Sequence, residues 1–248
     1  MSELEPSRLR PLLRGAFGEP YLYFAETGST QDVLRDGDYP HGAVALAEHQ
    51  SAGRGRSGRI WEDAPAANLL FSLLLDPPSG VELPGLSLVA GLAVATALER
   101  EAMVPALVKW PNDVLLDGRK IAGVLTEARP QAGWAVLGVG INVALAPDDF
   151  PPELRDRAGT LGRRPDELDA VLAELLAHLA VRLAQPVPAV LDALRARDAL
   201  QGRPLRWAGG TGTGAGIDDA GALRVRRPDG GVTTLEAGEV HLGTGAAV

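Results

Sequence analysis

Two continuous apolar runs flank a polar, glycine-rich segment in the first third of the chain. The runs, Ala43–Ala47 and Asn68–Leu75, have the length and composition of buried strands. Between them lies Gly53–Trp61, GRGRSGRIW, whose first six residues fit the G-x-G-x-x-G pattern of dinucleotide-binding turns. That pattern must open a helix, but Arg59–Pro65, RIWEDAP, is typical of a loop. The glycines are therefore predicted to lie in a strand-to-strand loop.

Short apolar runs separated by turn residues predict further strands in the middle of the chain. Lys109–Lys120, KWPNDVLLDGRK, predicts a strand ending at Trp110, a Pro-Asn-Asp turn, a short strand and an Asp-Gly hairpin turn. Ile121–Glu127 and Trp134–Val143 follow as strands. The second carries Gly138 and Gly140, which would let a planar ligand lie against the backbone, although glycines in strands also mark bulges.

The last third changes from helical to β periodicity. Pro165–Gln185 places six apolar residues on one helical face and is more typical of a core helix than of a partner groove. Those residues are Leu168, Val171, Leu172, Leu175, Leu176 and Leu179. Gly202–Leu242 is rich in glycine turns and short alternating runs, so it predicts a small β unit.

Composition limits the classes of function. The 248 residues are 46% hydrophobic and 23% charged, which suits one large globular domain and a small one. A net charge of −8 argues against a general nucleic-acid or membrane binder. The start has no apolar leader, and the most apolar stretch, Leu83–Leu98, is too short to span a bilayer. We therefore expect a cytoplasmic protein.

The candidate chemistry is cationic. The chain has no cysteine, and its four histidines show no metal-ligand spacing. The glycine-rich loop carries Arg54, Arg56 and Arg59, which suit folding over a small anion, although a solvated basic loop would look the same. Of 24 basic residues only Lys109 and Lys120 are lysines. Their closeness suggests positions where a compact ammonium cannot be exchanged for guanidinium, with chance as the alternative.

Taken together, three motifs resemble those of biotin protein ligases. They are GRGRSGRIW, KWPNDVLLDGRKIAGVLTE and GVGINV, in that order, and Glu26–Gln31 is similar to the family's strand-to-helix turn, with Gln31 where Asn is more usual. The resemblance extends over residues 20–245. It implies an α+β fold: a mixed sheet like that of class II aminoacyl-tRNA synthetases over residues 1–198, then a small SH3-like β-barrel over residues 199–248. Gly243 departs from the family, because many relatives have an arginine there.

The resemblance implies a site for biotin and ATP. Ser29, Thr30 and Gln50 would hold the ureido ring, Arg54 and Arg56 would clamp the carboxylate and the α-phosphate, and Lys120 would meet the phosphates. The implied catalytic residues are Lys120, Arg54 and Arg56. The implied biotin-binding set is Ser29, Thr30, Gln31, Gln50, Gly53, Arg54, Gly55, Arg56, Lys120 and Gly123. The implied nucleotide-binding set is Trp61, Asn112, Asp113, Gly138, Gly140 and Asn142, with Trp61 closing over adenine. Asp113 would either orient the incoming lysine or anchor the loop, and no metal ligands are identified.

The implied reaction is attachment of biotin to a lysine of a biotin carboxyl carrier domain, through biotinyl-5′-AMP and with Mg²⁺ accompanying ATP. A homodimer is consistent with the resemblance. Three alternatives stay open. A lipoate or octanoyl ligase would share the fold, but its His-bearing glycine motif is missing. A biotin-sensing repressor would need a DNA-binding module, for which about 20 residues before the ligase core are too few, so no nucleic-acid partner is expected. A catalytically silent biotin-binding protein would share the motifs.

Overall fold

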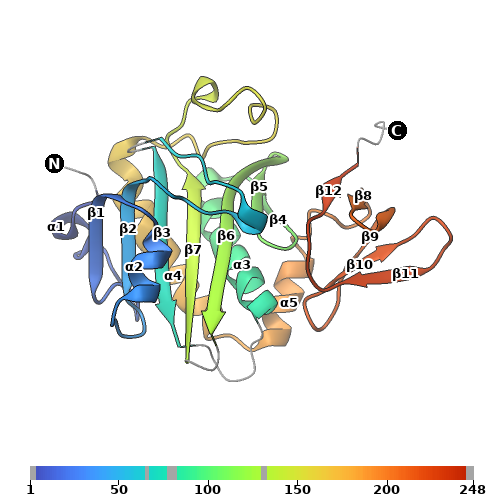
Figure 1. Cartoon of the computed structure of the whole chain (residues 1–248), viewed down its shortest axis with the longest axis horizontal. Coiled ribbons are helices and arrows are strands. Elements are labelled where there is room, and N and C mark those ends of the chain that lie inside the picture. Colours follow the sequence, from blue (N-terminus) through green and yellow to red (C-terminus); the bar gives the residue numbers. More distant parts are fainter. Residues whose placement is uncertain (1–3, 65–66, 77–82, 130–132, 244–248) are drawn as a thin grey trace.

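A seven-stranded mixed sheet is the centre of the larger unit of the protein (Figure 1). The computed structural model describes residues 4–64, 67–76, 83–129 and 133–243. The strand order is β1-β2-β3-β7-β6-β5-β4. The strands are β1 (Tyr21–Thr27), β2 (Val44–Gln50), β3 (Asn68–Leu75), β4 (Ala106–Lys109), β5 (Asp113–Leu116), β6 (Arg119–Arg129) and β7 (Trp134–Asn142). Among these described strands only the β1–β2 pair is parallel, so the sheet is mostly antiparallel.

Helices cover both faces of this sheet, and the central strand β3 is accordingly buried along its whole length. The helices are α1 (Pro6–Leu9), α2 (Thr30–Asp36), α3 (Leu83–Ala102), α4 (Leu168–Leu183) and α5 (Val187–Arg195). In β2, Val44 and Leu46 belong to the main core with α3 and α4, whereas Ala45 belongs to a smaller core with Leu34 of α2. Because successive side chains of a strand point to opposite faces, one strand serves both cores.

The second unit is a five-stranded antiparallel sheet in the order β11-β10-β9-β8-β12. Its strands are β8 (Pro204–Trp207), β9 (Gly210–Ile217), β10 (Leu223–Arg226), β11 (Val232–Leu235) and β12 (His241–Leu242). It lies beside the β4 and β5 end of the large sheet (Figure 1). The buried indole of Trp110, just after β4, donates to the carbonyl of Gly221 over 3.1 Å. This hydrogen bond ties the two units together next to the turn that follows β4.

The α+β fold with a separate C-terminal β unit is confirmed. The strand predicted at residues 68–75 coincides with β3, and all six apolar residues predicted to share a face of the long helix are buried in α4. The first turn of that predicted helix is instead a short 3₁₀ segment, Pro165–Glu167. The domain boundary at residues 198 and 199 falls between α5 and β8 and stays a prediction. None of the helices in the described ranges combines the length and the apolarity that crossing a bilayer requires.

Candidate functional site

The glycine-rich segment forms a hairpin-like loop between β2 and β3. The Gly55 amide donates to the Arg59 carbonyl over 2.7 Å, and the Trp61 amide donates to the Gly53 carbonyl over 3.2 Å. The tip is a 3₁₀ turn, Arg56–Gly58, in which Ser57 has φ 57°, and extended backbone follows it. No helix opens here, so the prediction of a strand-to-strand loop is confirmed and the dinucleotide pattern is accidental.

This loop covers a pocket on the face of the large sheet that carries α2. Of the sixteen different residues predicted for the site, the structure brings most together around this one pocket. The predicted residues that line it are Ser29, Thr30, Gln31, Gln50, Arg54, Gly55, Arg56, Trp61, Asn112, Asp113, Lys120, Gly123, Gly138 and Gly140. They come from α2 and its N-cap, the end of β2, the loop, the turn after β4, the start of β5, and strands β6 and β7.

One end of the pocket is polar and uncharged. Ser29 caps α2 by accepting from the Gln31 amide, which fixes the start of the helix at the pocket. The side-chain oxygen of Gln50 accepts from the Thr30 amide over 2.8 Å and lies 3.0 Å from the Thr30 hydroxyl. The same hydroxyl lies 2.8 Å from that of Ser72 in β3. These hydrogen bonds fix the Thr30 and Ser72 hydroxyls and the Gln50 side chain relative to one another.

The middle of the pocket has a floor of glycine backbone. A Cβ built on Gly140 would lie 2.6 Å from the Trp61 ring, and one built on Gly123 would lie 2.9 Å from it. A Cβ on Gly138 would lie 2.8 Å from the Gln31 side chain. Contacts this short do not occur, so only glycine allows these side chains to lie flat on the sheet. In this structure the Trp61 indole packs on Gly123 and Gly140, and the predicted packing of a planar ligand on this backbone stays a prediction.

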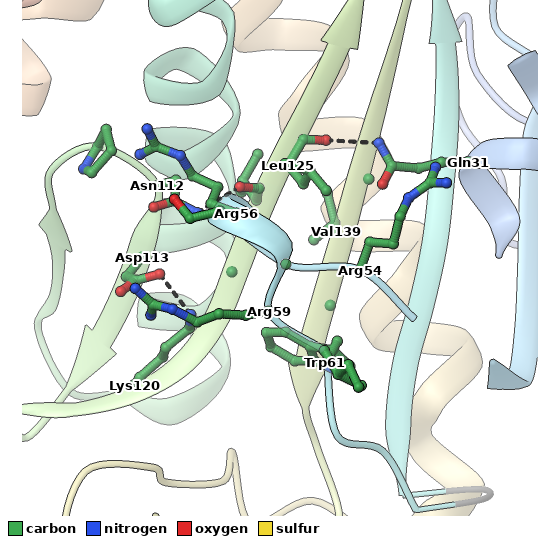
Figure 2. A pocket seen from close by; sticks show the side chains of 18 of the residues that line it. Gln31, Arg54, Arg56, Arg59, Trp61, Asn112, Asp113, Lys120, Leu125 and Val139 are labelled. Carbon is green, nitrogen blue, oxygen red and sulfur yellow. Dashed lines mark hydrogen bonds and ion pairs between the residues drawn. The ribbon is translucent and has the colours of Figure 1, made fainter. Parts of the chain in front are cut away.

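The other end of the pocket is cationic. Lys120 Nζ lies 2.7 Å from Asp113 Oδ1, and Lys109 Nζ lies 3.4 Å from Asp113 Oδ2. The half-buried Arg56 side chain extends toward Asn112 (Figure 2). Burial lowers the pKa of Arg56, and the positive charge of Arg59 acts in the same direction, whereas Asp113 opposes both. Three cations around one carboxylate leave an excess of positive charge that suits an anionic ligand.

Arg54 occupies a different position from Arg56. Its guanidinium contacts Asp32 of α2 at 2.6 Å and Glu127 of β6 at 3.1 Å, and Figure 2 shows the side chain lying toward Gln31. Both carboxylates already engage its terminal nitrogens, so in this conformation Arg54 anchors the loop to the sheet and to α2. Its predicted contact with a ligand carboxylate stays a prediction, and would require these ion pairs to loosen.

Two predicted residues do not line the pocket. The buried Asn142 amide donates to the Gly159 carbonyl over 2.9 Å, and its oxygen accepts from Asn68 over 3.0 Å. A Cβ on Gly53 would lie 3.1 Å from the Trp61 carbonyl, so the close approach at Gly53 is to the loop itself. Both residues support the shape of the site from behind, and their predicted ligand contacts stay predictions.

The C-terminal unit contributes lining residues that the motifs did not identify. Gly238, Glu239 and Val240 line the pocket, and Glu239 forms an ion pair with Arg59 of the loop. No local pattern marks Glu239, because its role arises only when the two units meet. Within the described ranges, no group of three or more His, Cys, Asp or Glu residues could hold a metal ion.

Known proteins resemble this chain in sequence and in fold. The model of the biotin/lipoate A/B protein ligase family matches residues 23–143. The biotin--[acetyl-CoA-carboxylase] ligase of Mycobacterium tuberculosis is 38% identical over 239 residues, which cover 88% of this chain and 87% of that protein. A solved structure of biotin protein ligase from Aquifex aeolicus in complex with biotin and ATP superposes with a TM-score of 0.81 at 29% identity, covering 90% of this chain and 98% of that one.

The chain therefore belongs to the biotin protein ligases, within the biotin/lipoate A/B protein ligase family. The Bacillus subtilis bifunctional ligase/repressor BirA is 36% identical over 157 residues, which cover 60% of this chain. The aligned part spans about half of that relative, 48% of its length.

Proposed function

We propose that this protein attaches biotin to a lysine of a biotin carboxyl carrier domain through biotinyl-5′-AMP. The observation that carries the proposal is one pocket with an uncharged polar end and a cationic end, joined by glycine backbone. Biotin requires both ends, because its ureido ring is neutral and its carboxylate must meet a phosphate. The names of the Mycobacterium and Aquifex relatives, which refer to biotin ligation and to bound biotin and ATP, support the assignment.

In the first half-reaction, a carboxylate oxygen of biotin attacks the α-phosphorus of ATP and the bond to the β-phosphate breaks, releasing pyrophosphate. Three groups carry negative charge in that step: the biotin carboxylate, the α-phosphate and the departing pyrophosphate. Neutralising their charge and aligning the reacting atoms therefore dominate the catalysis. Lys120 and Arg56, at the cationic end, would supply the positive charge. Trp61 and the loop would exclude water from the mixed anhydride, which hydrolyses readily.

In the second half-reaction, the lysine amine of the carrier attacks the acyl carbon of biotinyl-5′-AMP, loses a proton and displaces AMP. Asp113 lies at the cationic end of the pocket, and two lysines already contact it. We assign Asp113 to holding these ammonium groups in place, and its orientation of the incoming amine stays a prediction.

The substrates and partners follow from the same chemistry. Mg²⁺ would arrive bound to ATP as part of the substrate. The partner would be the carrier domain of a biotin-dependent carboxylase, and the ATP requirement favours the cytoplasm. A net charge of −8 argues against nucleic acid as a partner. Strand β1 pairs only with β2 among the described strands, which leaves one edge of the large sheet open to a homodimer.

The decisive experiment is incubation with biotin, MgATP and an isolated carrier domain, followed by intact mass measurement. We expect the carrier to gain one biotinyl group. A carrier that gains mass only when lipoate or octanoate replaces biotin would identify the alternative ligase. Biotin binding without biotin-dependent exchange of pyrophosphate into ATP would identify a silent binding protein.

A further inference from the structure

A buried carboxylate closes the base of the glycine-rich loop. The loop residues 51–62 lie between Gln50, the last residue of β2, and Asp63. Asp63 Oδ2 accepts from the backbone amide of Gln50 over 3.0 Å, and Asp63 Oδ1 lies 2.8 Å from Nδ1 of His49. The Asp63 side chain is only 3% exposed, whereas that of His49 is 38% exposed. Both oxygens of one carboxylate therefore join the two ends of the loop.

The Asp63 carboxylate lies where the hydrogen-bonded pairing between β2 and β3 has ended. The pairing of β2 with β3 ends at Ala47 and Leu70, so the Gln50 amide has no β3 partner in the register. A backbone N–H left unpaired in a partly buried place is costly, and the Asp63 carboxylate satisfies it in place of a strand carbonyl. The loop is thereby held shut at its base, while Ser57 and Gly58 at its tip are exposed.

This contact continues into the pocket. Gln50, whose backbone is held by Asp63, presents its side-chain oxygen to both the amide and the hydroxyl of Thr30. Displacing the Gln50 backbone would therefore move the uncharged polar end of the pocket. Trp61, two residues before Asp63, now packs on the glycine floor. Losing the Asp63 contact would also free the loop segment that holds Trp61 there.

We propose that Asp63, with His49, is a positioning residue that fixes the base of the loop, aligns Gln50 at the uncharged polar end of the pocket and holds Trp61 over the glycine floor. Asp63 does not line the pocket and acts through its neighbours. The inference rests on the proposed function, because the aligned ligand is biotin. The state of the loop, however, can also be measured without any ligand.

The test compares Asp63→Ala with Glu62→Ala, a matched control at the exposed neighbouring residue. We expect Asp63→Ala to raise the KM for biotin roughly tenfold, the scale of a lost hydrogen bond to a charged group, and the KM for ATP by less, because Gln50 is the pocket residue that Asp63 holds directly. Biotinyl-5′-AMP should escape faster and label lysines of a bystander protein. Asp63→Asn should keep most of the parent's biotin KM, since its side-chain oxygen can still accept from the Gln50 backbone amide. His49→Ala should have a milder effect than Asp63→Ala because that bond remains.

Ligand-free proteolysis separates this inference from the proposed function. Trypsin cleaves after arginine, and the loop holds Arg54, Arg56 and Arg59. Asp63→Ala should be cut in the loop several-fold faster than Glu62→Ala at equal melting temperature. If the parent protein forms no biotinyl-5′-AMP, the proposed function fails while the cleavage result still stands. If Asp63→Ala matches Glu62→Ala in both cleavage and biotin KM, or differs only in melting temperature, the positioning role is wrong.

Discussion

Exchanging Lys120 for arginine tests whether the pocket needs a compact ammonium rather than any positive charge. Lys120 Nζ lies 2.7 Å from Asp113 Oδ1 and 5.5 Å from the centre of the Trp61 ring. A Cβ built on Gly123 would lie 3.2 Å from Nζ, so the lysine tip runs close along the backbone of β6. The planar guanidinium is wider than the ammonium, so in the place of the lysine tip it would crowd Asp113 and Trp61.

The expected loss of stability in Lys120→Arg is smaller than the expected loss of catalytic rate. The Lys120 side chain is 36% exposed, and a pair of this kind contributes about 0.2–1 kcal/mol to stability. A change of that size shifts the melting temperature of a protein of this length by at most about 4 °C. Misplacing one electrostatic stabiliser costs about 10²-fold in rate, or roughly 2.7 kcal/mol. Lys120→Arg should therefore damage adenylate formation more than folding.

The assay measures pyrophosphate release and melting temperature for Lys120→Arg and for the control Lys109→Arg. Lys109 contacts the other oxygen of Asp113 at the longer distance of 3.4 Å, so we expect a smaller effect there. Transfer from preformed biotinyl-5′-AMP should suffer less than adenylation in Lys120→Arg, because no pyrophosphate leaves in that step. Near-normal adenylation by Lys120→Arg, or equal damage from both substitutions, would refute the reasoning.

Three further predictions concern closure over the intermediate. Arg56→Gly should change stability by less than about 0.5 kcal/mol yet release biotinyl-5′-AMP, seen as labelling of bystander lysines; retention equal to that of the parent would contradict this. Gly140→Ala should push the Trp61 indole off the sheet and shorten adenylate retention, whereas an unchanged lifetime in a rapid filtration assay would show that the ring is not needed there. Glu239→Gln should free Arg59 and speed tryptic cleavage of the loop without lowering the melting temperature, and an unchanged cleavage rate would rule out the ion pair as a restraint.

Local pattern determined much of the fold, and the resemblance of the motifs to a known family indicated the site. Continuous apolar runs predicted β3 and β7, and the apolar face of the long helix was predicted residue by residue. The residues after Gly58 distinguished this loop from a Rossmann turn, because the signals that start a helix are local in the sequence. The motifs also indicated fourteen residues that the structure brings to one pocket, although their individual roles stay predictions.

Only the tertiary structure decided which side chains the site residues contact. Arg54 and Arg56 look equivalent in the sequence, yet Arg54 pairs with Asp32 and Glu127 while Arg56 enters the cationic end. Such differences depend on partners far apart along the chain, and no local periodicity encodes them. Asp63 and Glu239 were missed for the same reason. A carboxylate in a loop shows its role only when folding brings an unpaired amide, or a cation from another unit, within hydrogen-bonding distance.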